Sequence, residues 1–206
     1  MKFDPGDLSF ADVHKLMIGS IVPRPIAFVS TISKDGKNNI APFSYFNGVC
    51  SKPPTIMFAP ARRGWDGKEK DTLVNIRDNK QFVVNIVSEN IVEQMVMCAT
   101  DFDPTVDEFD ISGLNAQTSK KVLPPRLKES KVSFECELNQ IIEIGDKNPG
   151  SGFIVIGTIV LFHIDDSIYE SGHIRLDKLE PIGRLAGNWY TRPNDNFEII
   201  RKIKPK

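Results

Sequence analysis

The sequence contains few of the residues that would indicate a disulfide framework, a metal site or a membrane segment. Its three cysteines, Cys50, Cys98 and Cys136, are odd in number and widely spaced, and none forms a CxxC pair. A reducing compartment, the cytoplasm, is therefore expected. The three histidines show no HExxH spacing, so we expect no metal. No apolar run approaches the roughly 20 residues of a transmembrane helix, and residues 1–5 contain no secretory apolar region.

Excess charge and a nucleotide fingerprint are also missing. The net charge of −1 excludes a general basic field, so neither nucleic acid nor an anionic membrane is expected as a partner. The sequence lacks GxGxxG, which excludes a dedicated Rossmann site for NAD(P)H. A chain of 206 residues with 40% hydrophobic residues is most simply one domain, spanning 1–206.

Residues 38–46 are the segment around which the chain is organised. Pro42 cannot lie within a fully hydrogen-bonded ladder, so the segment is predicted to be an edge strand. The small Ala41 and Ser44 leave backbone amides uncovered. Flat apolar surface is supplied by the aromatic residues Phe43, Tyr45 and Phe46. Such a surface suits a planar ring with hydrogen-bonding edges, such as a flavin.

A second segment predicts a phosphate site. Lys70 precedes a helix start that we expect Asp71 or Thr72 to cap, with Leu73 and Ile76 on the apolar side. A helix N-terminus beside a lysine favours a phosphate. Without this helix start, the polar loop before it would be interpreted as a solvated surface loop. Together the two segments indicate a phosphorylated flavin.

The remaining pattern is mainly that of a β protein. Further strands are predicted at 26–33, 55–59, 81–87, 132–138 and 153–164, and helices at 9–18 and 89–99. An Asp-Gly turn at 34–37 predicts that the strand at 26–33 pairs with the edge strand. Six or more strands with antiparallel hairpins favour a closed or nearly closed barrel with helical additions.

Three segments have competing interpretations. The acidic residues 100–109 are expected to form a solvated loop rather than an acid–base pair. His163 is expected to be a hydrogen-bonded structural residue rather than a base. Residues 181–190 are expected to form a final strand that closes the core, although Trp189 and Tyr190 would also suit a lid over a ring.

The order of several motifs, from about Ile18 to Tyr190, resembles that of the flavin-reductase-like, FMN-binding split-barrel family. This family includes flavoredoxins and the reductase components of two-component monooxygenases. The motifs are Pro23-Arg24-Pro25, Val29-Ser30-Thr31, residues 39–46, Pro53-Pro54, Lys70-Asp71-Thr72 with Asn75, and Arg184-Leu185 with Gly187 and Tyr190. The resemblance implies a Greek-key split β-barrel with a few peripheral helices, usually a homodimer with FMN at or near the interface.

The resemblance also implies roles for individual residues. Ser30 and Thr31 would face the flavin through their backbone. The isoalloxazine ring and ribityl chain would be lined by Asn39, Ala41, Ser44, Tyr45 and Phe46. The phosphate would be held by Lys70, Asp71 and Thr72. Arg62 and Cys50 are further candidates for the cofactor site. Two features depart from the family, namely Ala186 at the first glycine of its RL-G-G form and the acidic insert at 100–109.

The function that follows is a flavoprotein that transfers hydride or electrons between NAD(P)H and flavin or another acceptor. One alternative is an FMN carrier that passes electrons between proteins without nicotinamide turnover, and another is a barrel that binds no flavin. In an FMN site the cofactor does the redox chemistry, so no side chain is nominated as acid or base.

Overall fold

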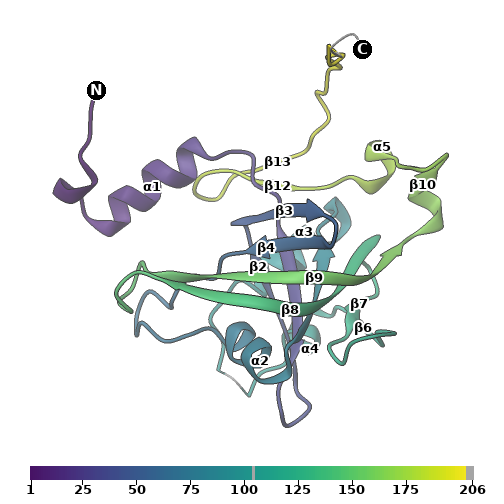
Figure 1. Cartoon of the computed structure of the whole chain (residues 1–206), viewed down its shortest axis with the longest axis horizontal. Helices are drawn as coiled ribbons and strands as arrows, with labels where there is room; N and C mark the ends of the chain where they lie inside the picture. Colours follow the sequence, from purple (N-terminus) through teal and green to yellow (C-terminus); the bar gives the residue numbers. More distant parts are fainter. Residues whose placement is uncertain (104, 203–206) are drawn as a thin grey trace.

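The computed structural model describes residues 1–103 and 105–202 (Figure 1). One antiparallel sheet of seven strands has the order β2-β1-β5-β8-β9-β4-β3. Its strands are β1 (Ala27–Ile32), β2 (Asn38–Phe43), β3 (Phe46–Ser51), β4 (Pro54–Phe58), β5 (Gln81–Ile86), β8 (Val132–Ile144) and β9 (Gly152–Ile164). The sheet supplies the framework on which all other elements are placed.

The connection between β2 and β3 shows that the sheet is curved. These strands are its two edges, yet only Ser44 and Tyr45 join them. Three extended residue steps span about 10 Å, so the two edges must come within that distance at this point. The edges approach without pairing there, which gives the predicted mainly β, nearly closed barrel.

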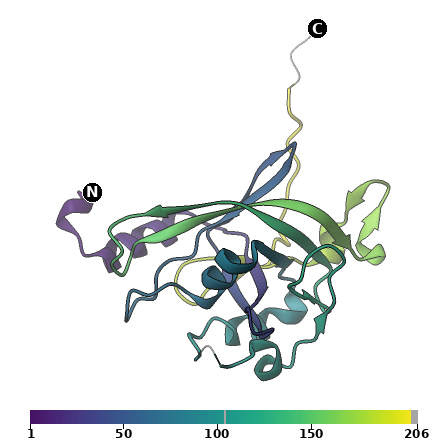
Figure 2. The same ribbon diagram turned by 60° about the horizontal axis from the view of Figure 1, so that its bottom comes forward.

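Short helices and small sheets surround the barrel. The α-helices are α1 (Phe10–Ser20), α2 (Asp71–Asn79), α3 (Val92–Met97), α4 (Glu108–Ser112) and α5 (Leu176–Leu179). The 3-10 helices are η1 (Pro5–Asp7), η2 (Glu89–Ile91) and η3 (Asp166–Ile168). The two-stranded sheets pair β6 (Ala116–Gln117) with β7 (Arg126–Leu127), β10 (Tyr169–Glu170) with β11 (His173–Ile174), and β12 (Gly183–Arg184) with β13 (Tyr190–Thr191). In Figure 1, α1 and the β12–β13 hairpin lie above the sheet and α2 and α4 lie below it, and Figure 2 shows the same molecule turned.

Two apolar clusters form the core because β1 is buried on both faces. Ala27 and Val29 face the barrel interior with Phe58 and Phe82, and α2 closes this cluster with its apolar side. The alternate residue Phe28 faces a second cluster with the segment around α3 and α4. Both faces of β1 are therefore shielded from water. β1 is an interior strand, and its neighbour β2 forms the edge of the sheet.

Most predicted elements are confirmed. The turn between β1 and β2 closes with a hydrogen bond from Ser33 N to Lys37 O over 2.8 Å, and Gly36 has the positive φ (81°) that such a turn requires. β2 is an edge strand as predicted, although residues 38–46 do not form one strand, since the chain bends at Ser44 and Tyr45. The expectation that 181–190 forms a final strand that closes the core is correct only in part: Ile182 is buried in the second cluster, but β12 and β13 form a hairpin outside the seven-stranded sheet, and β12 is bridged to Arg24.

Helix α1 leaves its apolar side uncovered. Ser9 caps it as predicted, accepting a hydrogen bond from Asp12 N over 3.2 Å. None of its residues is buried, and Phe10, Leu16 and Met17 are 60%, 43% and 44% exposed. The helix therefore contributes apolar surface that the described part of the chain leaves exposed. No helix within residues 1–103 and 105–202 is long and apolar enough to cross a membrane.

Candidate functional site

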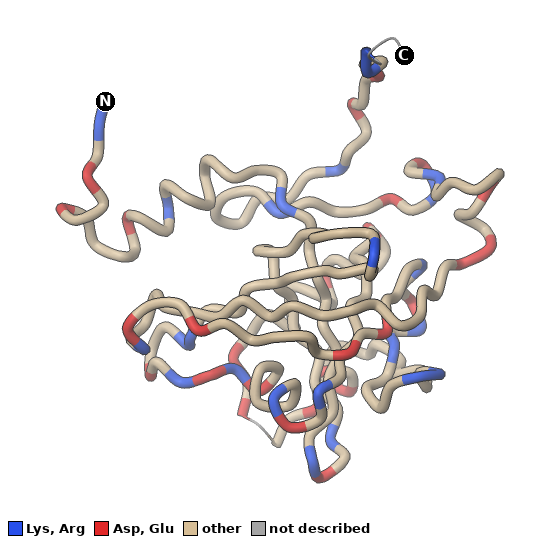
Figure 3. The backbone as a smooth tube through the Cα atoms, in the orientation of Figure 1, with Lys and Arg blue, Asp and Glu red and all other residues tan. Residues whose placement is uncertain are grey.

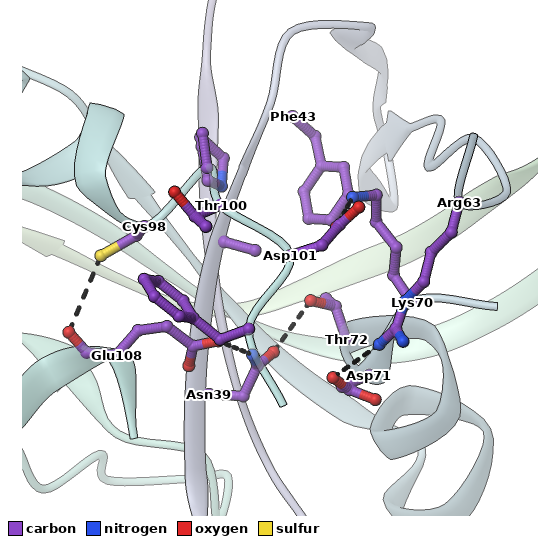
Figure 4. Close-up of a pocket in the computed structure, with 14 residues that line it drawn as sticks. Asn39, Phe43, Arg63, Lys70, Asp71, Thr72, Cys98, Thr100, Asp101 and Glu108 are labelled. Carbon is purple, nitrogen blue, oxygen red and sulfur yellow. Dashed lines mark hydrogen bonds and ion pairs between the residues drawn. The ribbon is translucent and has the colours of Figure 1, made fainter. Parts of the chain in front are cut away.

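A small cavity of about 40 Å³ lies where the edge strand β2 meets the start of α2 (Figure 4). Five of the residues predicted for a cofactor line it: Asn39, Ala41, Lys70, Asp71 and Thr72. Further lining residues come from the loop before α2, from the segment after α3 and from α4, and include Arg63, Cys98, Asp101 and Glu108. The structure thus brings the two predicted segments to one place.

The side chain of Asn39 joins these segments directly. Its Oδ1 accepts hydrogen bonds from Thr72 Oγ1 over 2.9 Å and from Thr31 Oγ1 over 3.1 Å. Its Nδ2 donates to Glu108 Oε1 over 2.9 Å, and Asn75 Nδ2 donates to Thr31 Oγ1 over 3.0 Å. All of these groups are buried. A satisfied buried network of this kind fixes the side chains that compose it, so β2, α2 and α4 are held in one arrangement.

Glu108 is the buried acid of the site. Its Oε2 accepts from Ile40 N over 3.2 Å, and the residue is only 6% exposed. Burial raises the pKa of Glu108, while its hydrogen bonds from Ile40 and Asn39 oppose the rise. The prediction that 100–109 is entirely a solvated loop is wrong at this position; Pro104 lies outside the described residues. The neighbouring Phe109 is 3% exposed. This apolar residue in the acidic segment is the sequence feature that could have indicated that α4 packs on the core.

The first turn of α2 has free donors. Lys70 is its N-cap residue and provides no side-chain cap, so the expected cap by Asp71 or Thr72 is wrong. The hydroxyl of Thr72 is used by Asn39 instead. Within the described part of the chain, the backbone N–H groups of Asp71 and Thr72 have no acceptor. These donors and the helix dipole favour an anion at this point.

The cations of the site already have carboxylate partners. Lys70 Nζ lies 2.6 Å from Asp101 Oδ1, and Arg63 Nη2 lies 2.9 Å from Asp71 Oδ2. Burial raises the pKa of Asp71, and the charge of Arg63 opposes this effect. The Nε atom of Arg63 is buried without a partner among the described residues. Figure 3 shows basic and acidic residues interspersed along the backbone, so an anion here would compete with internal carboxylates.

A second cavity of about 190 Å³ continues the site along β2. It is lined by Ser44, Arg184 and Tyr190 and shares Pro42 and Ala99 with the first cavity. Both cavities therefore open along one side of β2.

The edge position of β2 explains how it accommodates Pro42. Ile40 points its N–H away from β1 and toward Glu108, and because orientation alternates along a strand, residue 42 faces the same way. Pro42 therefore removes no hydrogen bond between β1 and β2.

The aromatic residues of 38–46 do not form a single platform. Phe43 is 6% exposed and packs in the core, with its ring centroid 5.1 Å from that of Phe58. Tyr45 is half-buried, and its hydroxyl has no partner among the described residues. Phe46 begins β3 and lines a different cavity together with Cys50. The three rings therefore do not form one surface: Phe43 packs in the core and lines the first cavity, whereas Phe46 lines a different one.

Ser30, Thr31 and Arg62 are not part of either cavity surface. Ser30 and Thr31 are fully buried in β1; Ser30 also has backbone neighbours on both sides, in β2 and β5. Arg62 pairs with Glu143 over 2.5 Å and stacks on Phe153, whereas Arg63 lines the first cavity. Sequence reasoning missed Arg63, Asp101 and Glu108 as lining residues, and the assignment of all these residues to a cofactor stays a prediction.

Cysteine chemistry is disfavoured at the site. Burial raises the pKa of Cys98 to about 11, so this lining residue remains a thiol at neutral pH. His163, which was expected to be structural, lies outside the site and contacts Glu135 Oε1 at 2.5 Å. Within the described residues no group of three or more potential metal ligands is found.

Comparison with known proteins identifies the relatives of this chain. The model of the flavin reductase like domain matches residues 18–178. Component B of nitrilotriacetate monooxygenase from Bacillus cereus is 35% identical, with a TM-score of 0.92 over 97% of this chain and 98% of its own. The 2-nitrobenzoate 2-nitroreductase NbaA of Pseudomonas fluorescens is 31% identical, with a TM-score of 0.87 over 98% of this chain and 96% of its own.

A more distant structure supports the fold alone. A Shewanella frigidimarina protein with a split barrel domain is 19% identical and has a TM-score of 0.83 over 98% of this chain and 100% of its own. The predicted split barrel is confirmed by this likeness together with the seven-stranded sheet.

Proposed function

Because this chain belongs to the flavin reductase like family, we propose that it binds FMN and acts as an oxidoreductase that transfers hydride or electrons between NAD(P)H and flavin or another acceptor. The observation that carries the proposal is the 2.9 Å hydrogen bond between Thr72 and Asn39. It joins the uncovered strand edge to the anion-favouring helix end in one cavity.

The groups present fit the phosphate end of FMN. Lys70, the N–H groups of Asp71 and Thr72, and the unpartnered Nε of Arg63 would hold it. A cavity of about 40 Å³ holds no three-ring system, so the ring would lie outside it, along β2 at Ala41, Ser44 and Tyr45. Contacts of the ligand with Phe46, Ser30, Thr31 and Arg62 would come through the backbone or from a neighbouring subunit.

When bound, the flavin supplies the redox chemistry, and the chain supplies binding and position. Each carboxylate oxygen of Glu108 accepts one hydrogen bond, from Asn39 and from Ile40 N, so its role is to orient Asn39. The strand edge supplies backbone groups to a ligand, and the α2 terminus supplies an anion site. No side chain is assigned as a general acid or base.

A second copy of this chain is the proposed stable partner. The uncovered apolar side of α1 and the exposed edge strand β3, where Val49 is 54% exposed, support it. An open cavity of about 530 Å³ beside β3 and β4 is lined largely by apolar residues, among them Phe46, Ile56 and Phe162. Exposed apolar side chains that lie together in this way are typical of a protein–protein interface.

The proposal is tested by titrating the purified protein with FMN and with riboflavin and following the quenching of flavin fluorescence. If the phosphate accepts two charge-assisted bonds of about 1.5–3 kcal/mol each, riboflavin binds on the order of 10²–10⁴ times more weakly than FMN. Equal affinities for FMN and riboflavin would exclude the proposed phosphate site. If neither compound binds, the proposed function is wrong.

Electron carrier and enzyme are distinguished by a second experiment. NADH or NADPH is mixed with the FMN-loaded protein in a stopped-flow instrument without any other protein. Rapid loss of flavin absorbance identifies nicotinamide turnover, which the similarity to a monooxygenase component and to a nitroreductase favours. Absence of bleaching with bound FMN would identify an electron carrier.

A further inference from the structure

The second cavity, at the Ser44 end of β2, differs from the first in how its positive charge is balanced. In the first cavity, Lys70 and Arg63 each have a carboxylate partner, Asp101 and Asp71. The second cavity is lined by Arg184, which forms no ion pair with any Asp or Glu of residues 1–103 and 105–202. The uncompensated positive charge of the groove therefore lies at the Ser44 end.

A second guanidinium adds to this charge. Arg24 is 5% exposed and donates only to neutral oxygens, those of Ile18, Ile21, Leu185 and Ser44, at 2.6–3.4 Å. Burial lowers the pKa of Arg24; the interaction with Tyr45 opposes this effect, and the charge of Arg184 adds to it. Arg24 and Arg184 are also joined by two backbone hydrogen bonds of 2.8 and 2.9 Å. Two neighbouring cations without a carboxylate favour an added anion.

Arg184 has the geometry of a recognition residue. Its guanidinium carbon lies 4.4 Å from the centroid of the Tyr190 ring, and one Nη atom donates to Gly187 O. This leaves further N–H donors of its planar fork for a bidentate partner such as a carboxylate. Pro42, Ile26 and Met95 give the rest of the cavity an apolar lining.

The size of the cavity limits the ligand. Its volume is about 190 Å³, below the roughly 300–1,000 Å³ of cavities for drug-sized molecules. A single ring with one carboxylate matches this volume and combines an anionic group for Arg184 with a flat face for Tyr190 and Pro42.

We propose that the cavity formed by Ser44, Arg184 and Tyr190 is the subsite for a small planar organic carboxylate, and that Arg184 determines this specificity. The inference rests on the proposed function, since the carboxylate would be the substrate that meets the cofactor on the same strand edge. Arg24 acts as a positioning residue that holds the β12–β13 hairpin against Ser44 and adds positive charge.

The test uses benzoate as the probe, with benzamide as its neutral analogue, in isothermal titrations of the protein with and without FMN. Benzoate is expected to bind at least about 10-fold more tightly than benzamide. Arg184→Gln is expected to weaken benzoate binding about 10- to 100-fold, the loss of a charge-assisted hydrogen bond, and to leave benzamide unchanged. Arg184→Lys, which keeps the charge but not the fork, is expected to fall between the two.

Arg192→Gln is the matched control, because Arg192 is an exposed arginine one residue after β13 that pairs with Glu89 over 2.6 Å. It should bind benzoate as the unchanged protein does. Equal affinity of benzoate for the unchanged protein and for Arg184→Gln, at unchanged thermal unfolding temperature, would overturn the proposal. If Arg184→Gln unfolds, Arg184→Lys decides: undiminished benzoate binding there overturns the bidentate role.

Two further titrations distinguish a carboxylate ligand from a phosphate ligand, and the subsite from the FMN site. Adenosine monophosphate tests a phosphate source: tighter binding of this compound than of benzoate, lost in Arg184→Gln, would overturn the carboxylate assignment and point to a dinucleotide phosphate. FMN affinity is measured for the same variants. Failure of the unchanged protein to bind FMN would overturn the proposed function, whereas normal FMN binding without any benzoate binding would overturn only the subsite.

Discussion

The carboxylate of Asp101 lies 2.6 Å from Nζ of Lys70, beside the first turn of α2 where the free backbone donors are. These two residues are 31 positions apart in the sequence. Any anion that uses Lys70 must therefore replace or join an internal carboxylate. The ion pair closes the small cavity from the side of the segment that follows α3 (Figure 4).

Replacing Asp101 by Asn is expected to tighten FMN binding. Both side chains are about one-third exposed, and such a pair contributes about 0.2–1 kcal/mol. Release of Lys70 and loss of repulsion toward a phosphate should lower the FMN dissociation constant about 2- to 10-fold, measured by fluorescence quenching. Asp110→Asn, a matched change at an exposed residue of α4, should have no effect. Weaker binding in Asp101→Asn would show that the carboxylate helps to hold the ligand.

The double variant Lys70→Ala with Thr72→Ala is expected to weaken FMN binding while the barrel remains folded. Loss of the Lys70 contact, a charge-assisted bond worth about 1.5–3 kcal/mol, predicts a reduction of about 10- to 100-fold, because alanine at position 72 keeps the backbone N–H that favours the anion. Thr72 also loses its bond to Asn39, which costs about 1 kcal/mol of unfolding free energy. The Asn39 amide keeps Thr31 as a donor. Lys68→Ala, on the same loop and 74% exposed, is the control, and unchanged FMN affinity in the double variant would place the phosphate elsewhere.

How far the sequence determines this site depends on the range of the interactions. The edge strand, its turn at Gly36 and the start of α2 follow from local patterns, and all were predicted. Asp101 and Glu108 were missed because only the tertiary fold brings the acidic segment back to β2 and α2. A loop has no periodicity, so sequence could not choose Arg63 over Arg62.

The same reasoning explains two further differences. Amphipathicity predicts α1 but does not show what covers its apolar side, and within residues 1–103 and 105–202 none of the helix residues is buried. The hydrophobic pattern of 181–190 is compatible with any strand, and only the pairing shows that β12 and β13 form a separate hairpin.

Glu135 is expected to make stability fall at acid pH. It is fully buried on β8, and burial alone would raise its pKa, but donors from Lys120 N, His163 and Lys121 N outweigh burial and lower it. A lowered pKa stabilises the fold above the unfolded value of about 4.3, and the contribution is lost as the pH falls through the folded value.

The isosteric change Glu135→Gln tests this sign. In the variant, the side-chain NH₂ group would replace one carboxylate oxygen of Glu135, so the backbone N–H of Lys120 or Lys121 would lose its acceptor. The free energy of unfolding at pH 7 should therefore drop by about 1–3 kcal/mol. In urea titrations the difference from the unchanged protein should shrink below about pH 4. Glu137→Gln, an exposed position on the same strand, should show neither effect. A difference that stays constant between pH 7 and 3.5 would exclude the proposed titration.

Gly157 of β9 is expected to tolerate no side chain. A Cβ atom there would lie 2.3 Å from Cζ of the buried Phe82 ring. Gly157→Ala should therefore lower the free energy of unfolding by about 1–3 kcal/mol, the usual cost of overpacking a core. Gly48→Ala, where no atom lies within 4 Å of the added group, should change it far less in the same denaturant titration. Equal stability of Gly157→Ala and the unchanged protein would mean that Phe82 moves without cost.

The uncovered apolar side of α1 predicts that this helix contributes to a dimer interface. The unchanged protein should have twice the chain mass of 23.1 kDa in light scattering. Leu16→Glu with Met17→Glu places charges on residues that are 43% and 44% exposed, so folding of the chain is retained while burial against a second copy is opposed. The variant should therefore have the mass of a single chain at micromolar concentration. Lys15→Glu changes the charge of the same helix on its polar side and should remain dimeric. A monomeric mass for the unchanged protein would exclude this role of α1, because its apolar residues would then be exposed to water in the native state.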